Sequence, residues 1–253
     1  MKLAIPCMQC LQQFGKPTGE FVQVELNDDG SYLFECTHGH KSETLLQHHK
    51  FEILFDIGAY AILDGYYREA VSSFASSLER FYEFCVRVIS KRHGMSKDIF
   101  EKAWKLMSKQ SERQLGAFIF LWVIEFGKLP DLLNDKKMKS DEDMIKFRNR
   151  VVHEGKIPNR VEAIKFGNAV LEVLMPPFKV LRKSYEEEVV KITFENLQKA
   201  SSKSGRPTST MCESTVISFI YNEPDHHSKS LGKALEYLKE KRSTMRAFQG
   251  VTS

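Results

Sequence analysis

The sequence has no long hydrophobic run. A membrane-spanning helix needs roughly 18 to 20 predominantly apolar residues, whereas the longest apolar segment, residues 115–126, is shorter and carries Glu125. The first ten residues contain one lysine and a short apolar run that ends at Pro6, which is too short for the core of a signal peptide. We therefore expect a cytoplasmic protein with no membrane partner.

Cysteine is scarce, with five residues in a chain of 253. This number is too small for a disulfide framework in a chain of this length. Three of the five, Cys7, Cys10 and Cys36, lie in the first 40 residues beside two histidines. The clustering indicates a metal site in a protein from a reducing compartment.

A large excess of one charge is also absent, since the formal net charge is +4. The charge is nevertheless uneven, because residues 1–45 contain three basic and six acidic side chains. Phosphate binding requires positive charge at the contact surface. The rest of the chain, and not this acidic N-terminal segment, is therefore the better candidate for contact with nucleic acid.

Two clusters of metal-binding side chains frame the N-terminal segment. Cys7 and Cys10 form a CxxC pair, and Cys36 is followed by His38 and His40. Structural zinc sites take four such ligands in a tetrahedron. Residues 21–26 alternate as in a half-buried strand, 27–30 predict a turn, and 32–34 predict a return strand, which together indicate a β hairpin. The layout resembles a zinc ribbon over residues 1–42.

The fourth ligand is either His38 or His40. Similar zinc ribbons often end in a Cys-x-x-Gly-His knuckle, and this resemblance favours His40 after Gly39. Four protein ligands leave no open position for water, so we expect structural Zn²⁺ that supplies much of the folding free energy of a small module. The alternative is a set of reduced surface cysteines that bind no ion.

Beyond residue 42 the periodicity predicts a mainly α protein. Apolar residues recur at helical spacing, and the expected helices are residues 45–63, 67–93, 96–109, 111–127, 141–154, 158–175 and 178–200. Pro176 and Pro177 are expected to break or kink the chain. The domain prediction is a zinc ribbon at 1–42, a helical bundle at 43–200, and a linker with a C-terminal extension at 201–253. Within that extension we expect a linker at 201–215, a strand at 216–221 and a basic amphipathic helix at 231–242. We expect no metal site at His226 and His227, because the side chains of adjacent residues do not readily bind one ion.

Residues 147–155, FRNRVVHEG, contain Arg148, Asn149 and His153. This segment resembles the Arg-x₄₋₆-His motif of HEPN domains, in which a polar residue often follows the arginine. The resemblance covers about residues 45–175, although its specific part is six residues long. It implies a helical bundle that forms a homodimer and acts as a metal-independent endoribonuclease in phage defence or stress, under a possible protein regulator. Some HEPN toxins carry a modifiable tyrosine at the position of Gly155, so that form of regulation is not expected here.

The residue chemistry fits RNA cleavage. A protonated His153 in the last helical turn, before Gly155, can give a proton to a leaving 5′-oxygen, and the Arg148 fork can hold the phosphate. Attack by the ribose 2′-OH then leaves a 2′,3′-cyclic phosphate, so DNA should be inert. Asn149 is expected to orient the phosphate or the imidazole. Further cations expected to hold the RNA backbone are Lys146, Arg150 and Lys156.

Geometry requires a further condition. On a regular helix Arg148 and His153 lie about 140° apart, so they converge only if the helix end frays or if two copies combine their side chains. The structural alternative is that His153 caps carbonyls while Arg148 pairs with an acid such as Asp141 or Asp143. We interpret Glu79 and Glu83 as the polar face of a helix and not as partners of Arg148.

Two other classes of function remain open. In the first, the bundle is a non-catalytic dimerisation module and the ribbon docks a protein partner. In the second, the ribbon is a regulator that contacts nucleic acid, against which its acidic composition argues. We interpret five aromatic residues as core and dimer contacts and not as base-stacking platforms; they are Phe51, Phe55, Tyr60, Tyr66 and Tyr67.

Overall fold

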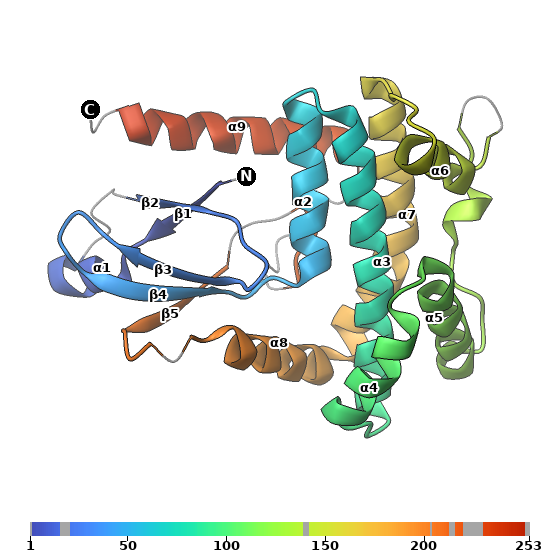
Figure 1. Ribbon diagram of the computed structural model, residues 1–253, viewed down its shortest axis with the longest axis horizontal. Coiled ribbons are helices and arrows are strands. Elements are labelled where there is room, and N and C mark those ends of the chain that lie inside the picture. Colours follow the sequence, from blue (N-terminus) through green and yellow to red (C-terminus); the bar gives the residue numbers. More distant parts are fainter. Residues whose placement is uncertain are drawn as a thin grey trace. The chain divides into compact units, whose positions relative to one another are not determined.

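The structure is a computed structural model that describes residues 2–15, 21–138, 142–202, 204–212, 216–219 and 230–250. It is mostly helical, with small sheets built chiefly from the N-terminal segment (Figure 1). The chain forms two compact units. The first comprises Met1–His49, Lys191–Ser214 and Arg242–Ser253, and the second comprises Lys50–Val190 and Thr215–Lys241.

In its described residues the first unit contains five strands, one short helix and the later parts of two further helices, α8 (Glu186–Ala200) and α9 (Leu231–Gly250). The strands and the short helix are β1 (Lys2–Pro6), α1 (Met8–Phe14), β2 (Phe21–Glu25), β3 (Ser31–Glu35), β4 (Lys41–Leu46) and β5 (Thr208–Met211). β1 pairs antiparallel with β2, β3 pairs antiparallel with β4, and β5 pairs parallel with β4. The expected strands β2 and β3 both form, but the expected hairpin between them is wrong. Alternation shows that a strand has one buried face, and it does not identify the pairing partner.

Two strands do not fit the expected domain boundaries. β4 crosses the expected boundary at residue 42, and β5 lies in the expected linker. β4 lies between β3 and β5, and five of its six side chains are buried, so it lacks the alternation of a half-buried strand. Leu45 and Leu46 therefore matched the helical period by chance. β5 forms because a polar Thr-Ser-Thr segment finds a partner strand that is distant in sequence.

The buried carboxylate of Glu43 attaches the C-terminal segment to β4. Glu43 is 1% exposed. Its side chain accepts hydrogen bonds from the Ser31 hydroxyl at 2.7 Å, the Ser202 N–H at 2.8 Å and the Thr208 hydroxyl at 3.2 Å. Burial alone would raise the pKa of Glu43. These hydrogen bonds together have the larger, opposite effect, so the pKa of Glu43 lies below its usual value of 4.5. The charged form is therefore the one that the fold stabilises.

Replacing Glu43 with glutamine should lower the free energy of unfolding by about 1–3 kcal/mol at neutral pH, because charge-assisted hydrogen bonds are lost in a buried place. The pKa of Glu43 is lower in the folded than in the unfolded protein. The carboxylate therefore contributes its full share of the free energy of unfolding above its unfolded pKa, and this stabilisation is lost as the pH falls through its folded pKa. Denaturant titrations at neutral and acidic pH measure the difference between wild type and Glu43→Gln. The exposed Glu35→Gln is the control, and equal effects of the two substitutions would contradict the role of Glu43.

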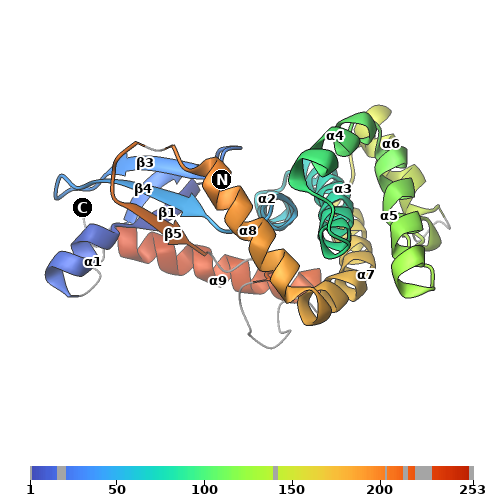
Figure 2. The same cartoon turned by 90° about the horizontal axis from the view of Figure 1, so that it is seen from below.

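The second unit is helical. Its elements are α2 (Lys50–Leu63), α3 (Tyr67–Arg92), α4 (Lys97–Met107), α5 (Ser111–Phe126), η1 (Leu133–Asp135), α6 (Met144–His153), α7 (Arg160–Ser184), the start of α8 (Glu186–Ala200) and the first part of α9 (Leu231–Gly250). α2 and α5 flank α3 on opposite sides (Figures 1 and 2). No helix in the described part of the chain is both long enough and apolar enough to cross a bilayer.

The core of the second unit centres on Phe74 of α3. Its ring lies 4.7 Å from the ring of Phe55. A Cβ atom added at Gly58 would lie 2.6 Å from the Phe74 ring, and one added at Gly167 would lie 2.8 Å from it. These two glycines therefore allow α2 and α7 to approach α3 closely, as dense core packing requires.

Of the two outcomes expected at Pro176 and Pro177, a break or a kink, the break is absent. α7 continues through both prolines to Ser184, and the next helix starts at Glu186. Interior prolines remove hydrogen bonds and cost about 3 kcal/mol or more. Buried side chains on both sides of the pair offset this cost through tertiary packing; they are Val173, Leu174, Pro177, Phe178 and Leu181.

The C-terminal extension is partly integrated into the helical unit. Residues 216–219 form bends and not the expected strand, and residues 220–221, like His226 and His227, lie outside the described residues. The backbone N–H groups of Val216 and Phe219 donate to the buried carboxylates of Asp56 and Glu52. The expected helix at 231–242 is present as the first part of α9.

Candidate metal centre and the Arg148 cluster

Two local structures bring the predicted metal ligands together. Cys7 is the N-cap of α1, which places Cys10 within the first turns of that helix. Cys36 and His40 close the turn between β3 and β4, where the Cys36 N–H donates to the His40 carbonyl at 3.1 Å. Gly39 in this turn has φ of +79°, a conformation that favours glycine. Backbone geometry thus fixes the direction of all four side chains.

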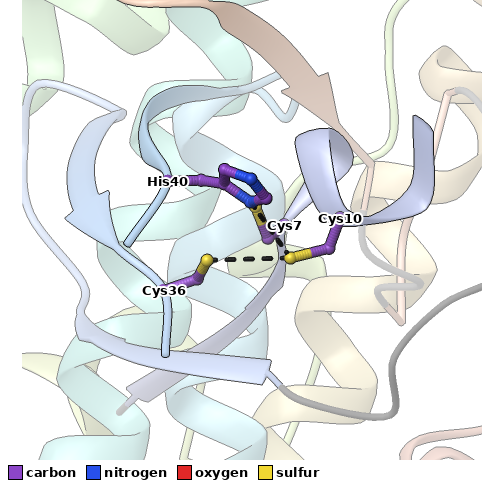
Figure 3. Close-up of side chains that lie close together, drawn as sticks. All are labelled: Cys7, Cys10, Cys36 and His40. Atoms are coloured by element: carbon purple, nitrogen blue, oxygen red, sulfur yellow. Dashed lines mark hydrogen bonds between the residues drawn. The ribbon is translucent and has the colours of Figure 1, made fainter. Parts of the chain in front are cut away.

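The four side chains converge (Figure 3). Cys10 Sγ lies 3.7 Å from Cys36 Sγ and 3.2 Å from His40 Nδ1, and Cys7 Sγ lies 3.8 Å from His40 Nδ1. The ligand atoms of all four residues lie within 4.8 Å of one another. A tetrahedral zinc site with ordinary bond lengths would have S···S separations of about 3.8 Å and S···N separations of about 3.6 Å. The donor set therefore fits a metal ion.

His40 completes this cluster in place of His38. The ring of His38 comes within 3.5 Å of Cys10 Sγ, but its ligand atoms do not belong to the cluster of four. The His38 side chain is exposed and its ring lies 5.2 Å from that of Phe14. The Cys/His cluster is thus compatible with the predicted zinc ribbon and with the choice of His40.

The thiols influence one another strongly. Burial alone would raise the pKa of the Cys7 thiol. Hydrogen bonds with the Cys10 backbone, His40 and the other two thiols together have the larger, opposite effect, and the pKa of Cys7 falls from its usual 9.0 to about 7. Burial and the adjacent Cys36 and Cys7 raise the pKa of Cys10 to about 12. Thiolates packed this closely repel one another. A divalent cation stabilises all of them, as metal binding to cysteine requires.

A second cluster surrounds Arg148 on α6. Phe147 and Val151 are fully buried and anchor α6 to the helical core. The Arg148 guanidinium donates to Glu79 Oε1 of α3 at 3.0 Å and to Asn149 Oδ1 at 2.8 Å. The Arg148 side chain is 20% exposed. Two oxygen atoms therefore hold the guanidinium in place, while a fifth of the side chain stays exposed.

His153 is the last residue of α6, as expected, and Gly155 has the expected positive φ. The His153 side chain is exposed. Among the described residues, no hydrogen bond joins it to Arg148. The Arg68 guanidinium of α3 donates to the Val152 carbonyl at 3.4 Å, which places a further cation beside the end of α6.

The predicted RNA-binding cations each have an acidic partner. Lys146 lies 3.6 Å from Asp143, Arg150 lies 3.2 Å from Glu142, and Lys156 lies 2.9 Å from Glu162. The first two of these cations have exposed side chains, and Lys156 is largely covered. The pairs reduce the local positive potential, so these three cations do not form a free basic patch.

The sequence does not predict two residues of this cluster, Glu79 and Arg68. The interpretation of Glu79 as part of a polar helix face is wrong, because it is the carboxylate that binds Arg148, whereas Glu83 pairs with Arg80. Of the two expected acidic partners of Arg148, Asp143 is instead the N-cap of α6, and Asp141 lies outside the described residues. Both Glu79 and Arg68 are far from α6 in sequence, and no local pattern predicts these contacts.

No protein-family model matches the chain, and comparisons with curated proteins and with solved structures found no match.

Proposed function

We propose that Cys7, Cys10, Cys36 and His40 bind Zn²⁺ in a structural role. Three sulfur donors and one imidazole nitrogen are the soft and borderline ligands that zinc selects. Their separations match a tetrahedral ion. Because four protein ligands fill a tetrahedron, the ion has no open position for substrate and acts as a cross-link between α1 and the β3–β4 turn.

We further propose that the helical unit is a metal-independent endoribonuclease. The observation that carries this proposal is a partly accessible Arg148, oriented by Glu79 and Asn149, five residues before an exposed His153 at the end of α6. An oriented guanidinium can bind a phosphate with two parallel hydrogen bonds. Arg68 adds positive charge at the end of α6.

The reaction needs only RNA and water. The ribose 2′-oxygen attacks its neighbouring phosphorus and loses its proton to solvent, while the bond from phosphorus to the 5′-oxygen breaks. A protonated His153 gives its proton to the departing 5′-oxygen. Because α6 stays helical to His153, Arg148 and His153 of one copy lie about 140° apart around the helix, so we propose that Arg148 of a second copy stabilises the additional negative charge on the phosphate oxygens. The products are a 2′,3′-cyclic phosphate and a 5′-hydroxyl end.

A non-catalytic binding module is the second candidate. The observation that favours it is the Arg148–Glu79 ion pair. Under this alternative, joining α6 to α3 is a sufficient role for the guanidinium, and no contact with phosphate is needed. Under this alternative the Arg148 cluster contributes to stability and binding of a partner, and RNA is not cut.

Cleavage of matched oligonucleotides separates these candidates. The full chain should cut a single-stranded RNA in the presence of a chelator that is too weak to strip the zinc site, and should leave an all-2′-deoxy oligonucleotide of the same sequence intact. Mass spectrometry of the fragments should show cyclic phosphate ends. Equal cleavage of the deoxy strand, or ends other than the cyclic phosphate, would exclude the proposed mechanism. Absence of cleavage across varied RNA sequences would favour the binding module.

A further inference from the structure

α5 has an unusual apolar outer face. Its buried stripe, Gln114, Phe118 and Trp122, is directed toward the core of the helical unit. A second stripe carries Phe120 and Ile124. Each of these residues follows a residue of the buried stripe by two positions, which places it about 200° away around the helix axis. These side chains are 74% and 75% exposed. A helix that is apolar on both faces is typical of a buried element.

The exposed patch extends beyond α5. Leu106 and Leu129 are each 74% exposed. The Arg113 guanidinium of α5 donates to the Leu106 carbonyl at 3.3 Å, so Leu106 lies near the N-terminal end of α5. Leu129 lies just beyond the opposite end, after the C-cap Gly127. Large exposed apolar side chains gathered on one helix and at both of its ends are typical of interaction surfaces in soluble proteins.

We infer that this α5 face binds the same face of a second copy of the chain. This face is self-complementary about Phe120. In an antiparallel pair of helices related by a two-fold axis at Phe120, positions at equal distances on either side of that residue meet. Ile124 of one copy then meets Gly116 of the other, where a Cβ atom would have no neighbour within 4 Å. The small residue provides space for the large one at both ends of the contact.

Two charged side chains are arranged with the same symmetry about Phe120. Glu112 lies in the first turn of α5 and Lys128 lies beyond its end, at equal distances from Phe120. Both side chains are exposed, and neither has an ion-pair partner in the described part of the chain. The two-fold axis pairs Glu112 of each copy with Lys128 of the other. Parallel packing would instead place like charges together, so the charges favour the antiparallel register.

Helix geometry permits this contact. Residues four apart form a ridge, and packing such ridges from two helices against each other gives a crossing angle of about −50°. Gly116, Phe120 and Ile124 form one such ridge. The apolar ends also match, because the Leu106 end of one copy faces the Leu129 end of the other. This dimer requires no nuclease activity, and its test is independent of the function proposed above.

Sedimentation equilibrium of the full chain tests the interface. The wild type should dimerise at micromolar concentration, and Phe120→Glu should raise the dimer dissociation constant at least ~100-fold, because it removes two apolar contacts and places two charges face to face. The matched control is Phe194→Glu, at another exposed phenylalanine on α8, which should leave the dissociation constant unchanged. Circular dichroism confirms that each variant keeps its helical content.

Charge exchange tests the register. Glu112→Lys and Lys128→Glu should each weaken the dimer about 3- to 10-fold at low salt, and the double variant should recover wild-type affinity. A wild type that stays monomeric overturns the inference, as does a dimer that Phe120→Glu leaves intact or that Phe194→Glu disrupts equally. If the double variant is weaker than both single variants, the antiparallel pairing is wrong.

Discussion

Replacing Cys36 with serine is expected to release the metal ion and unfold the first unit. The four ligands come from α1 and from the β3–β4 turn, so the ion joins two segments that otherwise share little core. Structural zinc contributes ~10–16 kcal/mol of apparent binding free energy in small domains at neutral pH. Loss of one ligand should therefore cost several kcal/mol, and His40→Ala should have the same effect.

The two histidines provide a matched comparison. His38→Ala should retain one zinc per chain by elemental analysis, whereas His40→Ala should lose it. Cys212→Ser, a change at a thiol outside the cluster of four in the same unit, should also retain the metal. Retention of zinc by His40→Ala with loss in His38→Ala would show that His38 is the ligand.

The two tryptophans make the unfolding easy to localise. Trp104 and Trp122 both lie in the helical unit. Metal loss should therefore leave tryptophan emission almost unchanged while amide exchange in residues 2–15 and 21–46 accelerates. A simultaneous change in both signals would mean that the helical unit cannot fold without the first unit.

Replacing His153 with alanine is expected to reduce RNA cleavage by about 10²- to 10⁴-fold, the usual contribution of a general acid. Because the side chain is exposed and makes no hydrogen bond among the described residues, the free energy of unfolding should change by less than about 0.5 kcal/mol. His93→Ala, at an exposed histidine that caps α3, should retain full activity. Single-turnover assays on one RNA measure all three proteins.

Arg148 requires a different comparison, since its removal also leaves Glu79 without its partner. Arg148→Lys keeps the positive charge but loses the planar fork, so it should lower the cleavage rate at least ~10-fold while changing stability little. Glu79→Gln should keep the hydrogen bond and retain most activity. If Arg148→Lys cleaves RNA as the wild type does, Arg148 serves only to join α6 to α3.

The sequence predicted features that depend on local periodicity or on ligand chemistry. The helices α3, α4 and α6 follow from their apolar spacing, and the metal cluster follows from Cys7, Cys10 and Cys36, because few other roles suit thiols at that spacing. His40 was favoured by a resemblance to zinc ribbons, and the geometry agrees.

Features that depend on distant partners were not predictable. β5 looks like a linker until β4 is placed beside it, and Glu79 looks like a solvent-exposed acid until α6 brings Arg148 to it. Pro177 shows the same limit in another form. Its local preference argues for a break, and burial in the helical core outweighs that preference.

The parallel pairing of β4 with β5 has a consequence for biosynthesis. Glu43 and Thr208 are register partners, although almost the whole helical unit separates them in the chain. As the nascent polypeptide leaves the ribosome from its N-terminus, β4 emerges early with one edge exposed and the Glu43 carboxylate lacking the Ser202 and Thr208 donors. The helical unit is synthesised in the meantime, so the sheet reaches its final form only late in translation.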